Sequence, residues 1–240
     1  MLDKIKAESL LFIDIETVSG QDSFETLSPK LQELWEKKSN YFRSDEESAA
    51  DVYQRAGIYA EFGKIVCIST GMIVQKDGVR KFVAKSFYGD DERRLLEDFA
   101  DMLTRFCAKP NRNLCAHNGK EFDFPYIARR MLINGVKLPE VLDIAGKKPW
   151  EVQFLDTMEL WKFGDYKHYT SLALLCEVFN IPTPKDDIDG SMVGEVYWND
   201  KDIERIAIYC EKDILATAQL FLRYQGQELI PEENFERILL

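Results

Sequence analysis

The stretch LLFIDIET, from Leu10 to Thr17, most constrains how this chain can fold. Its unbroken apolar start is typical of a strand buried on both faces. Two carboxylates, Asp14 and Glu16, follow at the end of that strand. Because alternate residues of a strand share a face, both side chains should point the same way. Adjacent like charges repel, and a cation between them would remove the repulsion; the alternative is that the strand ends and both acids are solvated.

The rest of the chain alternates between strand and helix patterns. Further strands are expected at Lys64–Val74, Val79–Tyr88, Asn113–His117 and Phe154–Asp156, the first two joined in a hairpin by Lys76-Asp77-Gly78. Helices are expected at Asp90–Ala108, Phe124–Asn134, Leu172–Phe179 and Asp200–Arg223, with a short helical segment in the tail. This order indicates a mixed α/β sheet flanked by helices, in a single domain over residues 1–240.

The segment between the first two strands is polar, acidic and longer than a connection needs. One helix is expected from Ser28-Pro29, a typical helix start, to about Lys38, and a second from Asp45 to about Ala56. We interpret residues 22–59 as a helical insertion after the first strand. The sequence leaves open whether it is a lid, a partner surface or a substrate clamp.

Composition excludes several classes of function. The net charge of -11 argues against a sequence-independent nucleic-acid coat, although an enzyme that holds a few nucleotides in a cleft stays possible. No apolar run approaches the roughly 20 residues of a membrane helix, and no secretory signal is visible, so we expect a cytoplasmic protein without membrane partners. The five cysteines form no CxxC pair and sit among apolar neighbours, which indicates reduced core thiols rather than a zinc site.

Two further acids stand at positions that suit chemistry. In CAHNGKEFDFPYIARR, Asp123 follows a strand and a short turn where a helix begins, although Asp is also an ordinary helix cap. In IAIYCEKDILATAQLF, Tyr209 and Asp213 lie one turn apart on an otherwise apolar helix stripe. An inward-facing carboxylate needs a partner, which could be a cation or simply a lysine or hydroxyl.

Together the motifs DIET, HNGKEFDFPYI and YCEKD supply four acids and a tyrosine from three separated elements. This set resembles the DEDD superfamily of 3'-5' exonucleases, in its tyrosine-bearing branch, because Ile208 stands where the other branch has histidine. The likeness is to the proofreading exonuclease domain of family B DNA polymerases, standing without a polymerase. It spans Asp14 to Asp213, most of the chain.

The resemblance implies a ribonuclease H-like fold, with a mixed sheet of about five strands and helices on both sides. It also implies two divalent cations, Mg²⁺ or Mn²⁺, held by Asp14, Glu16, Asp123 and Asp213. Such a pair clamps the attacking and leaving oxygens of a phosphoryl displacement. Tyr209 would orient the attacking water.

Substrate contacts also follow from the resemblance. The backbone of Thr17 and Val18 matches positions that hold the terminal nucleotide, and Asn118 and Phe122 match positions that touch the next one. Phe122 could stack on a base or belong to the core. Several basic side chains could contact phosphates or simply form a solvated surface: Lys120, Arg129, Arg130, Lys147, Lys148, Lys162, Lys167 and His168.

The leading hypothesis is a metal-dependent 3'-5' exonuclease acting on single-stranded DNA. DNA is favoured over RNA because the chain shows no helical RNA-binding appendage. A 3'-5' exoribonuclease, a non-catalytic nucleic-acid-binding module and a ribonuclease H-type endonuclease are the alternatives. The sequence identifies no protein partner.

Overall fold

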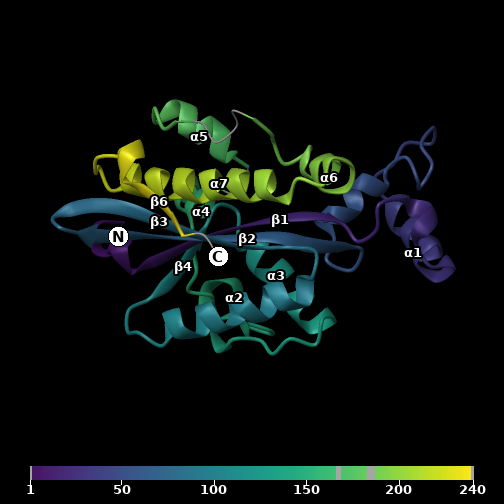
Figure 1. Cartoon of the computed structure of the whole chain (residues 1–240), viewed down its shortest axis with the longest axis horizontal. Helices are drawn as coiled ribbons and strands as arrows, with labels where there is room; N and C mark the ends of the chain where they lie inside the picture. The colour runs from purple at the N-terminus through teal and green to yellow at the C-terminus, as the bar shows by residue number, and fades with distance from the viewer. Residues whose placement is uncertain (1, 166–168, 183–186, 239–240) are drawn as a thin grey trace.

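A computed structural model describes residues 2–165, 169–182 and 187–238 of the chain. Its centre is a six-stranded mixed sheet (Figure 1). The strands are β1 (Leu10–Ser19), β2 (Gly63–Lys76), β3 (Val79–Tyr88), β4 (Asn113–Ala116), β5 (Leu155–Asp156) and β6 (Phe235–Ile238), in the spatial order β5-β4-β1-β2-β3-β6. Neighbours among β1, β2 and β3 are antiparallel, whereas β4 is parallel to β1, β5 to β4 and β6 to β3.

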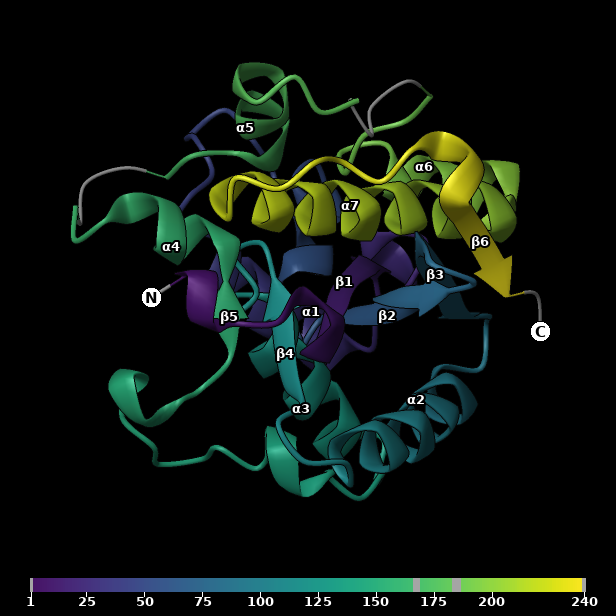
Figure 2. The ribbon, with the colours of Figure 1, turned by 90° about the vertical axis from the view of Figure 1, so that its left-hand side faces the viewer.

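Helices cover both faces of this sheet. On one face lie α2 (Glu92–Cys107) and α3 (Asp123–Ile133), and on the other α7 (Ile203–Tyr224) crosses β1, β2 and β3 (Figures 1 and 2). The shorter helices α4 (Thr157–Lys162), α5 (Leu172–Val178) and α6 (Val193–Glu195) lie on the α7 side. Short 3₁₀ turns span Leu2–Lys4, Ala7–Ser9, Phe24–Thr26, Tyr53–Ile58, Glu140–Leu142, Pro149–Glu151 and Glu232–Asn234, and a π-turn spans Val196–Asp200.

The alternation along β1 decides which face receives the acids. Leu11, Ile13 and Ile15 are buried in the core under α2 and α3. Leu10 and Phe12 are buried in the separate core under α7. Since side chains alternate along a strand, the even-numbered residues that follow, including both acids, project toward α7.

The expectation of about five strands is wrong by one edge strand. The tail forms β6 after a single 3₁₀ turn, where only a helical segment was expected. Its pairing with β3 is supported by the ring of Phe235, which stacks on Phe82 at 6.3 Å, and by Arg237, whose Nε lies 2.9 Å from the buried Glu211 carboxylate of α7. A segment of four residues gains strand stability only from such tertiary contacts.

One of the two helices predicted in the insertion is present. Helix α1 (Pro29–Ser39) begins after Ser28, whose hydroxyl accepts the Leu31 N–H. The second predicted helix, from Asp45 to Ala56, is wrong, because this segment forms turns followed by a 3₁₀ helix. The Ser48 hydroxyl and N–H both bond the Asp51 carboxylate, and such local bonds compete with a helix.

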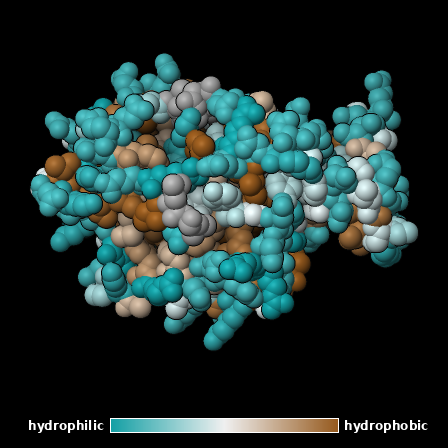
Figure 3. Space-filling model, in the orientation of Figure 1, coloured by the Kyte–Doolittle hydropathy of each residue, from teal (hydrophilic) through white to brown (hydrophobic). Residues whose placement is uncertain are grey.

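A small core of its own stabilises the insertion. Trp35 of α1 is fully buried, and its indole N–H donates to the Ala49 carbonyl at 2.8 Å. The rings of Phe42, Tyr53, Tyr59 and Phe62 surround it. The insertion projects from one end of the molecule, and hydrophilic side chains cover most of the face in view (Figure 3). Among the described residues, no helix is long and apolar enough to span a membrane.

The hairpin and the two long helices agree with expectation. Asp77 and Gly78 both have positive φ, 55° and 78°, which a two-residue hairpin turn requires. Asp91 caps α2 and Asp202 caps α7 through bonds to the N–H groups of Arg94 and Arg205. These elements place the middle of β1, the start of α3 and the middle of α7 close together.

Candidate active site between β1 and α7

The Asp14–Glu16 pair lies within β1 and not at its end. The strand continues to Ser19, with Asp14 opposite Ser69 of β2 and Glu16 opposite Cys67. The register then shifts between Glu16 and Thr17, which marks a β-bulge. Bulges re-aim side chains and release backbone groups from the ladder, and they are frequent beside active sites. The prediction that both carboxylates share one face is confirmed.

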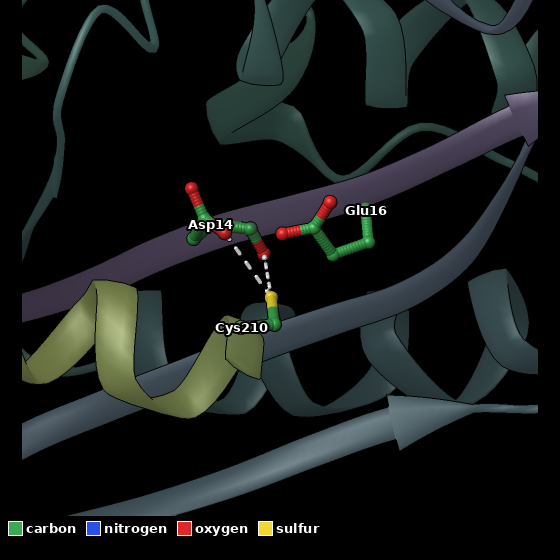
Figure 4. Close-up of side chains that lie close together, drawn as sticks. All are labelled: Asp14, Glu16 and Cys210. Atoms are coloured by element: carbon green, nitrogen blue, oxygen red, sulfur yellow. Dashed lines mark hydrogen bonds between the residues drawn. The ribbon is translucent and has the colours of Figure 1, made fainter. Parts of the chain in front are cut away.

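A cysteine joins this pair. Ligand atoms of Asp14, Glu16 and Cys210 all lie within 4.8 Å of one another (Figure 4). The thiol of Cys210, on α7, donates to the Asp14 carboxylate at 3.2 Å and to the Asp14 carbonyl at 3.5 Å. Burial raises the pKa of the Cys210 thiol well above its ordinary value, which keeps it a protonated donor. Sequence reasoning assigned Cys210 to the core and missed this contact, although Cys210 adjoins Tyr209 in YCEKD.

Asp123 is held against β1 by a hydrogen bond from the backbone of that strand. It is the first residue of α3 and is buried, and its Oδ1 accepts the Ile15 N–H of β1 at 3.2 Å. That backbone group lies between Asp14 and Glu16 in the chain. Burial, followed by the charges of Asp156 and Asp213, raises the pKa of Asp123 to about 7. The expected meeting of the DIET and HNGKEFDFPYI motifs therefore occurs.

Helix α7 brings the last two members of the set. Tyr209 is buried and Asp213 is half-buried, one helical turn apart. Burial raises the pKa of Asp14 well above its usual value, and the charges of Asp123, Asp213 and Glu16 add to that effect. Burial and the charges of Asp213, Glu16 and Asp14 likewise raise the pKa of the Tyr209 phenol. The charges of the three other acids thus all act on Asp14.

The donor set fits a hard divalent cation. Carboxylate oxygens are the ligands that Mg²⁺ and Mn²⁺ prefer, and a bound cation reverses the electrostatic cost of gathering acids in a buried site. Among the described residues, the group of potential ligand atoms that lie within 4.8 Å of one another belongs to Asp14, Glu16 and Cys210, and it does not include Asp123 or Asp213. The protonated thiol makes Cys210 a donor to Asp14 rather than a natural ligand, so the carboxylates are the better candidates.

A further buried acid, Asp156 at the end of β5, was not identified from the sequence. Its carboxylate accepts four backbone N–H groups: those of Asn118 and Lys120 at 3.0 and 3.1 Å, and those of Met158 and Glu159 at 3.0 and 3.3 Å. It therefore caps α4 and holds the turn that leads from β4 into α3. The signal in the sequence was Asp156-Thr157 directly after a short strand, a usual N-cap pattern.

The predicted nucleotide contacts differ in accessibility. Asn118 lies in that turn with φ of 62°, and its Oδ1 is buried without a donor in the described part of the chain. Phe122 is half-buried and packs on the Tyr126 ring at 5.3 Å, which favours its core interpretation. Thr17 is half-buried, whereas Val18 is buried with its backbone closely covered by Gly57 of the insertion.

Several basic side chains have partners already. Arg130 forms a buried ion pair with Glu92, its Nε 2.8 Å from Oε1, so its role is structural. Lys120 pairs with Glu159 at 2.7 Å, and Lys148 lies over the Trp150 ring. Lys167 and His168 lie outside the described residues. Both ring nitrogens of His117 are hydrogen-bonded, one to the Thr157 hydroxyl and one to the Thr170 carbonyl.

Comparison with known proteins shows similarity to family B DNA polymerases and to their exonuclease domain. Residues 58–237 match a family model described as "Predicted 3'-5' exonuclease related to the exonuclease domain of PolB". A DNA polymerase of Pyrococcus glycovorans is 26% identical over 155 residues, which cover 59% of this chain and 19% of the polymerase. The family B DNA polymerase of the archaeon Pyrobaculum calidifontis shares the fold, with a TM-score of 0.52 and 19% identity over 90% of this chain and 24% of that chain.

The matches cover part of each relative and part of the acid set. The chain spans about a fifth of the curated relative and about a quarter of the solved structure. The family match begins at residue 58, so it contains Asp123, Tyr209 and Asp213 but not Asp14 and Glu16. The structure brings these first two acids to the others and gives the sheet its ribonuclease H-like arrangement.

Proposed function

Because this chain belongs to the family of predicted 3'-5' exonucleases related to the exonuclease domain of PolB, we propose that it is a metal-dependent 3'-5' exonuclease. The proposed substrate is the 3' end of single-stranded DNA, and the reaction is hydrolysis of its terminal phosphodiester bond. The observation that carries the proposal is the convergence of acids from β1, α3 and α7 beside Tyr209. The family alone would not distinguish an active member from one that only binds nucleic acid.

Asp14, Glu16, Asp123 and Asp213 are the proposed ligands of two divalent cations. Bound Mg²⁺ or Mn²⁺ supplies Lewis-acid chemistry that activates water and stabilises charge on the departing 3'-oxygen. The chain's own contribution is to hold the carboxylates in place before a ligand arrives. The Ile15 N–H fixes Asp123, and the Cys210 thiol fixes Asp14.

Tyr209 is the proposed positioning residue for the attacking water. The raised pKa of its phenol keeps the hydroxyl neutral at physiological pH, so it donates or accepts a hydrogen bond and does not act as a base. It is held by burial in the cluster with Val18, Cys67 and Cys210. A hydroxyl oriented in this way limits the directions from which water approaches the phosphorus atom.

The Asn118 side chain is the proposed contact to the nucleotide next to the 3' end. It lies in the turn between β4 and α3, five residues before Asp123. Asp156 keeps the turn in place through the Asn118 and Lys120 N–H groups. The half-buried Thr17, just after the bulge, is the proposed neighbour of the terminal nucleotide.

A time course with 5'-labelled single-stranded DNA tests the proposal. Wild-type protein should yield a ladder of progressively shorter labelled products with Mg²⁺ or Mn²⁺, and none with EDTA. Asp213→Ala should abolish the ladder, whereas Asp98→Asn, an exposed acid on α2, should leave it unchanged. Faster degradation of a matched RNA would correct the choice of substrate. An intact strand under every metal condition would contradict the proposed activity.

A further inference from the structure

A pocket of about 430 Å³ lies beyond the acids, at the end of the sheet where β1 ends and β2 begins. Its lining residues are Lys64, Asp90, Tyr197, Trp198, Lys201 and Ile203. Lys64 of β2 lies opposite Val18 in the sheet, and Val18 follows Glu16 by two residues on β1. Ile203 begins α7 six residues before Tyr209, or about 9 Å along the helix. The pocket is therefore within reach of a strand whose end lies at the acids.

Two ammonium groups converge on the aromatic rings of this pocket. Lys64 Nζ lies 4.6 Å from the Tyr197 ring centre and 5.3 Å from that of Trp198, and Lys201 Nζ lies 5.1 Å from the Trp198 ring centre. Within the described ranges of the chain, neither ammonium forms an ion pair. Lys64 is half-buried and donates one hydrogen bond, to the Tyr197 hydroxyl at 2.6 Å. The positive charge here is only partly compensated.

The other polar groups of this pocket are the Tyr197 hydroxyl, the Asp90 carboxylate and the Trp198 indole N–H. The Tyr197 hydroxyl donates to Asp90 at 2.7 Å, so that carboxylate is already engaged. The indole N–H of Trp198 is buried and has no acceptor in the part of the chain that the structure describes. The remaining hydrogen-bonding capacity of the pocket therefore matches a ligand that is rich in acceptors and negatively charged.

We propose that this pocket binds a phosphate group of the substrate strand, away from the bond that is cut. The inference rests on the proposed exonuclease function, since it takes the ligand to be the same single strand. Phosphate oxygens accept from Lys64 and Lys201, and a neighbouring base can stack on an aromatic ring. A free nucleotide or inorganic phosphate offers the same chemistry, so both serve as comparison ligands.

The test measures binding of labelled oligothymidylate in EDTA, where no cleavage occurs. Lys201→Gln and Lys64→Met should each weaken binding by about 5- to 10-fold at low salt. Each should also lower the slope of log K against log salt by about 0.7, the value for one lost phosphate contact on a single strand. Lys109→Gln, an exposed lysine just after α2, is the matched control and should change neither quantity. Lys201 is exposed, so its variant decides the question if Lys64→Met fails to fold.

Two further arms separate the possible outcomes. Quenching of Trp198 fluorescence by thymidine monophosphate or inorganic phosphate, with unchanged strand affinity in both lysine variants, would replace the strand with a free ligand and overturn the proposal. In cleavage assays, the increase in KM caused by Lys201→Gln should shrink as the substrate is shortened. Metal-dependent cleavage with unaltered KM and salt slope in both variants would refute the pocket but keep the exonuclease. Lysine-dependent binding without any cleavage would support the pocket and contradict the proposed exonuclease activity.

Discussion

Replacing Asp123 by Asn should stabilise the metal-free protein at neutral and alkaline pH. Burial raises the pKa of Asp123 from 3.8 to about 7, so the folded state resists ionisation of this carboxyl. In the unfolded chain the carboxyl ionises freely above its ordinary pKa. The free energy of unfolding therefore falls as pH rises from about 4 to about 7, and the loss is complete above pH 7. Asn carries no charge, and its Oδ1 can still accept the Ile15 N–H.

The size of the effect follows from the difference in pKa. About three pKa units at about 1.36 kcal/mol each give about 4 kcal/mol as an upper bound, and side-chain relaxation around the charge lowers it. A gain of about 2–4 kcal/mol is expected at pH 8, with little change at pH 4.5. Relief of the repulsion between Asp123 and Asp14 is part of this gain.

Urea denaturation in EDTA at pH 4.5, 6 and 8 measures this difference directly. Asp98→Asn, on the exposed face of α2, controls for a general change in net charge. Added Mg²⁺ should stabilise the wild type at pH 8 and stabilise Asp123→Asn much less, because a cation offsets the same repulsion. A variant less stable than wild type at pH 8, or equally affected at pH 4.5, would refute the argument from carboxylate crowding.

Other side chains of the site give sharp expectations. Tyr209→Phe should lower kcat by about 10- to 100-fold and leave the thermal shift with Mn²⁺ intact, and an unchanged kcat would remove its role in positioning water. Asp156→Ala leaves four backbone N–H groups without their acceptor and should cost about 3 kcal/mol or more in urea denaturation; an unaltered midpoint would show that it holds nothing. Cys210→Ala removes a bond that lowers the pKa of Asp14, so the acid limb of the pH-rate profile should move to higher pH, while Cys210→Ser should restore it.

The sequence was informative wherever one periodicity dominated. The amphipathic stripe of α2 and the Asp77-Gly78 turn depend on local rules, and both elements agree with their predicted ranges within a few residues. The alternation in LLFIDIET correctly placed Asp14 and Glu16 on one face. Local pattern and tertiary packing agree in these segments, which is why the pattern alone was sufficient.

The predictions that failed concern segments whose structure is determined by tertiary contacts. β6 is stabilised by the ion pair between Arg237 and Glu211 of α7, and no local sequence pattern predicts that pair. The strand end was placed at the acids because polar residues usually mark a terminus, but pairing with β2 carries β1 on to Ser19. Cys210 and Asp156 were missed because each has an ordinary structural explanation, as a core thiol and as a helix cap. Their importance depends on which residues lie opposite them in space.

Burial alone does not separate Asp156 from the proposed metal-binding acids, but the number of hydrogen-bond donors does. A carboxylate offers about four lone-pair positions. Asp156 accepts four backbone N–H groups, three at Oδ1 and one at Oδ2, which leaves it less capacity for a ligand. Among the described residues, the hydrogen bond to the Asp14 carboxylate comes from the weak Cys210 thiol, and the one to the Asp123 carboxylate from another residue comes from the Ile15 N–H. These two acids are oriented but not saturated, so they keep oxygens available for a cation. Their raised pKa values record the resulting electrostatic cost to the metal-free fold. By linkage, a cation that removes this cost must bind more tightly as the carboxyls ionise, which makes metal affinity and metal-induced stability rise together between about pH 5 and pH 8.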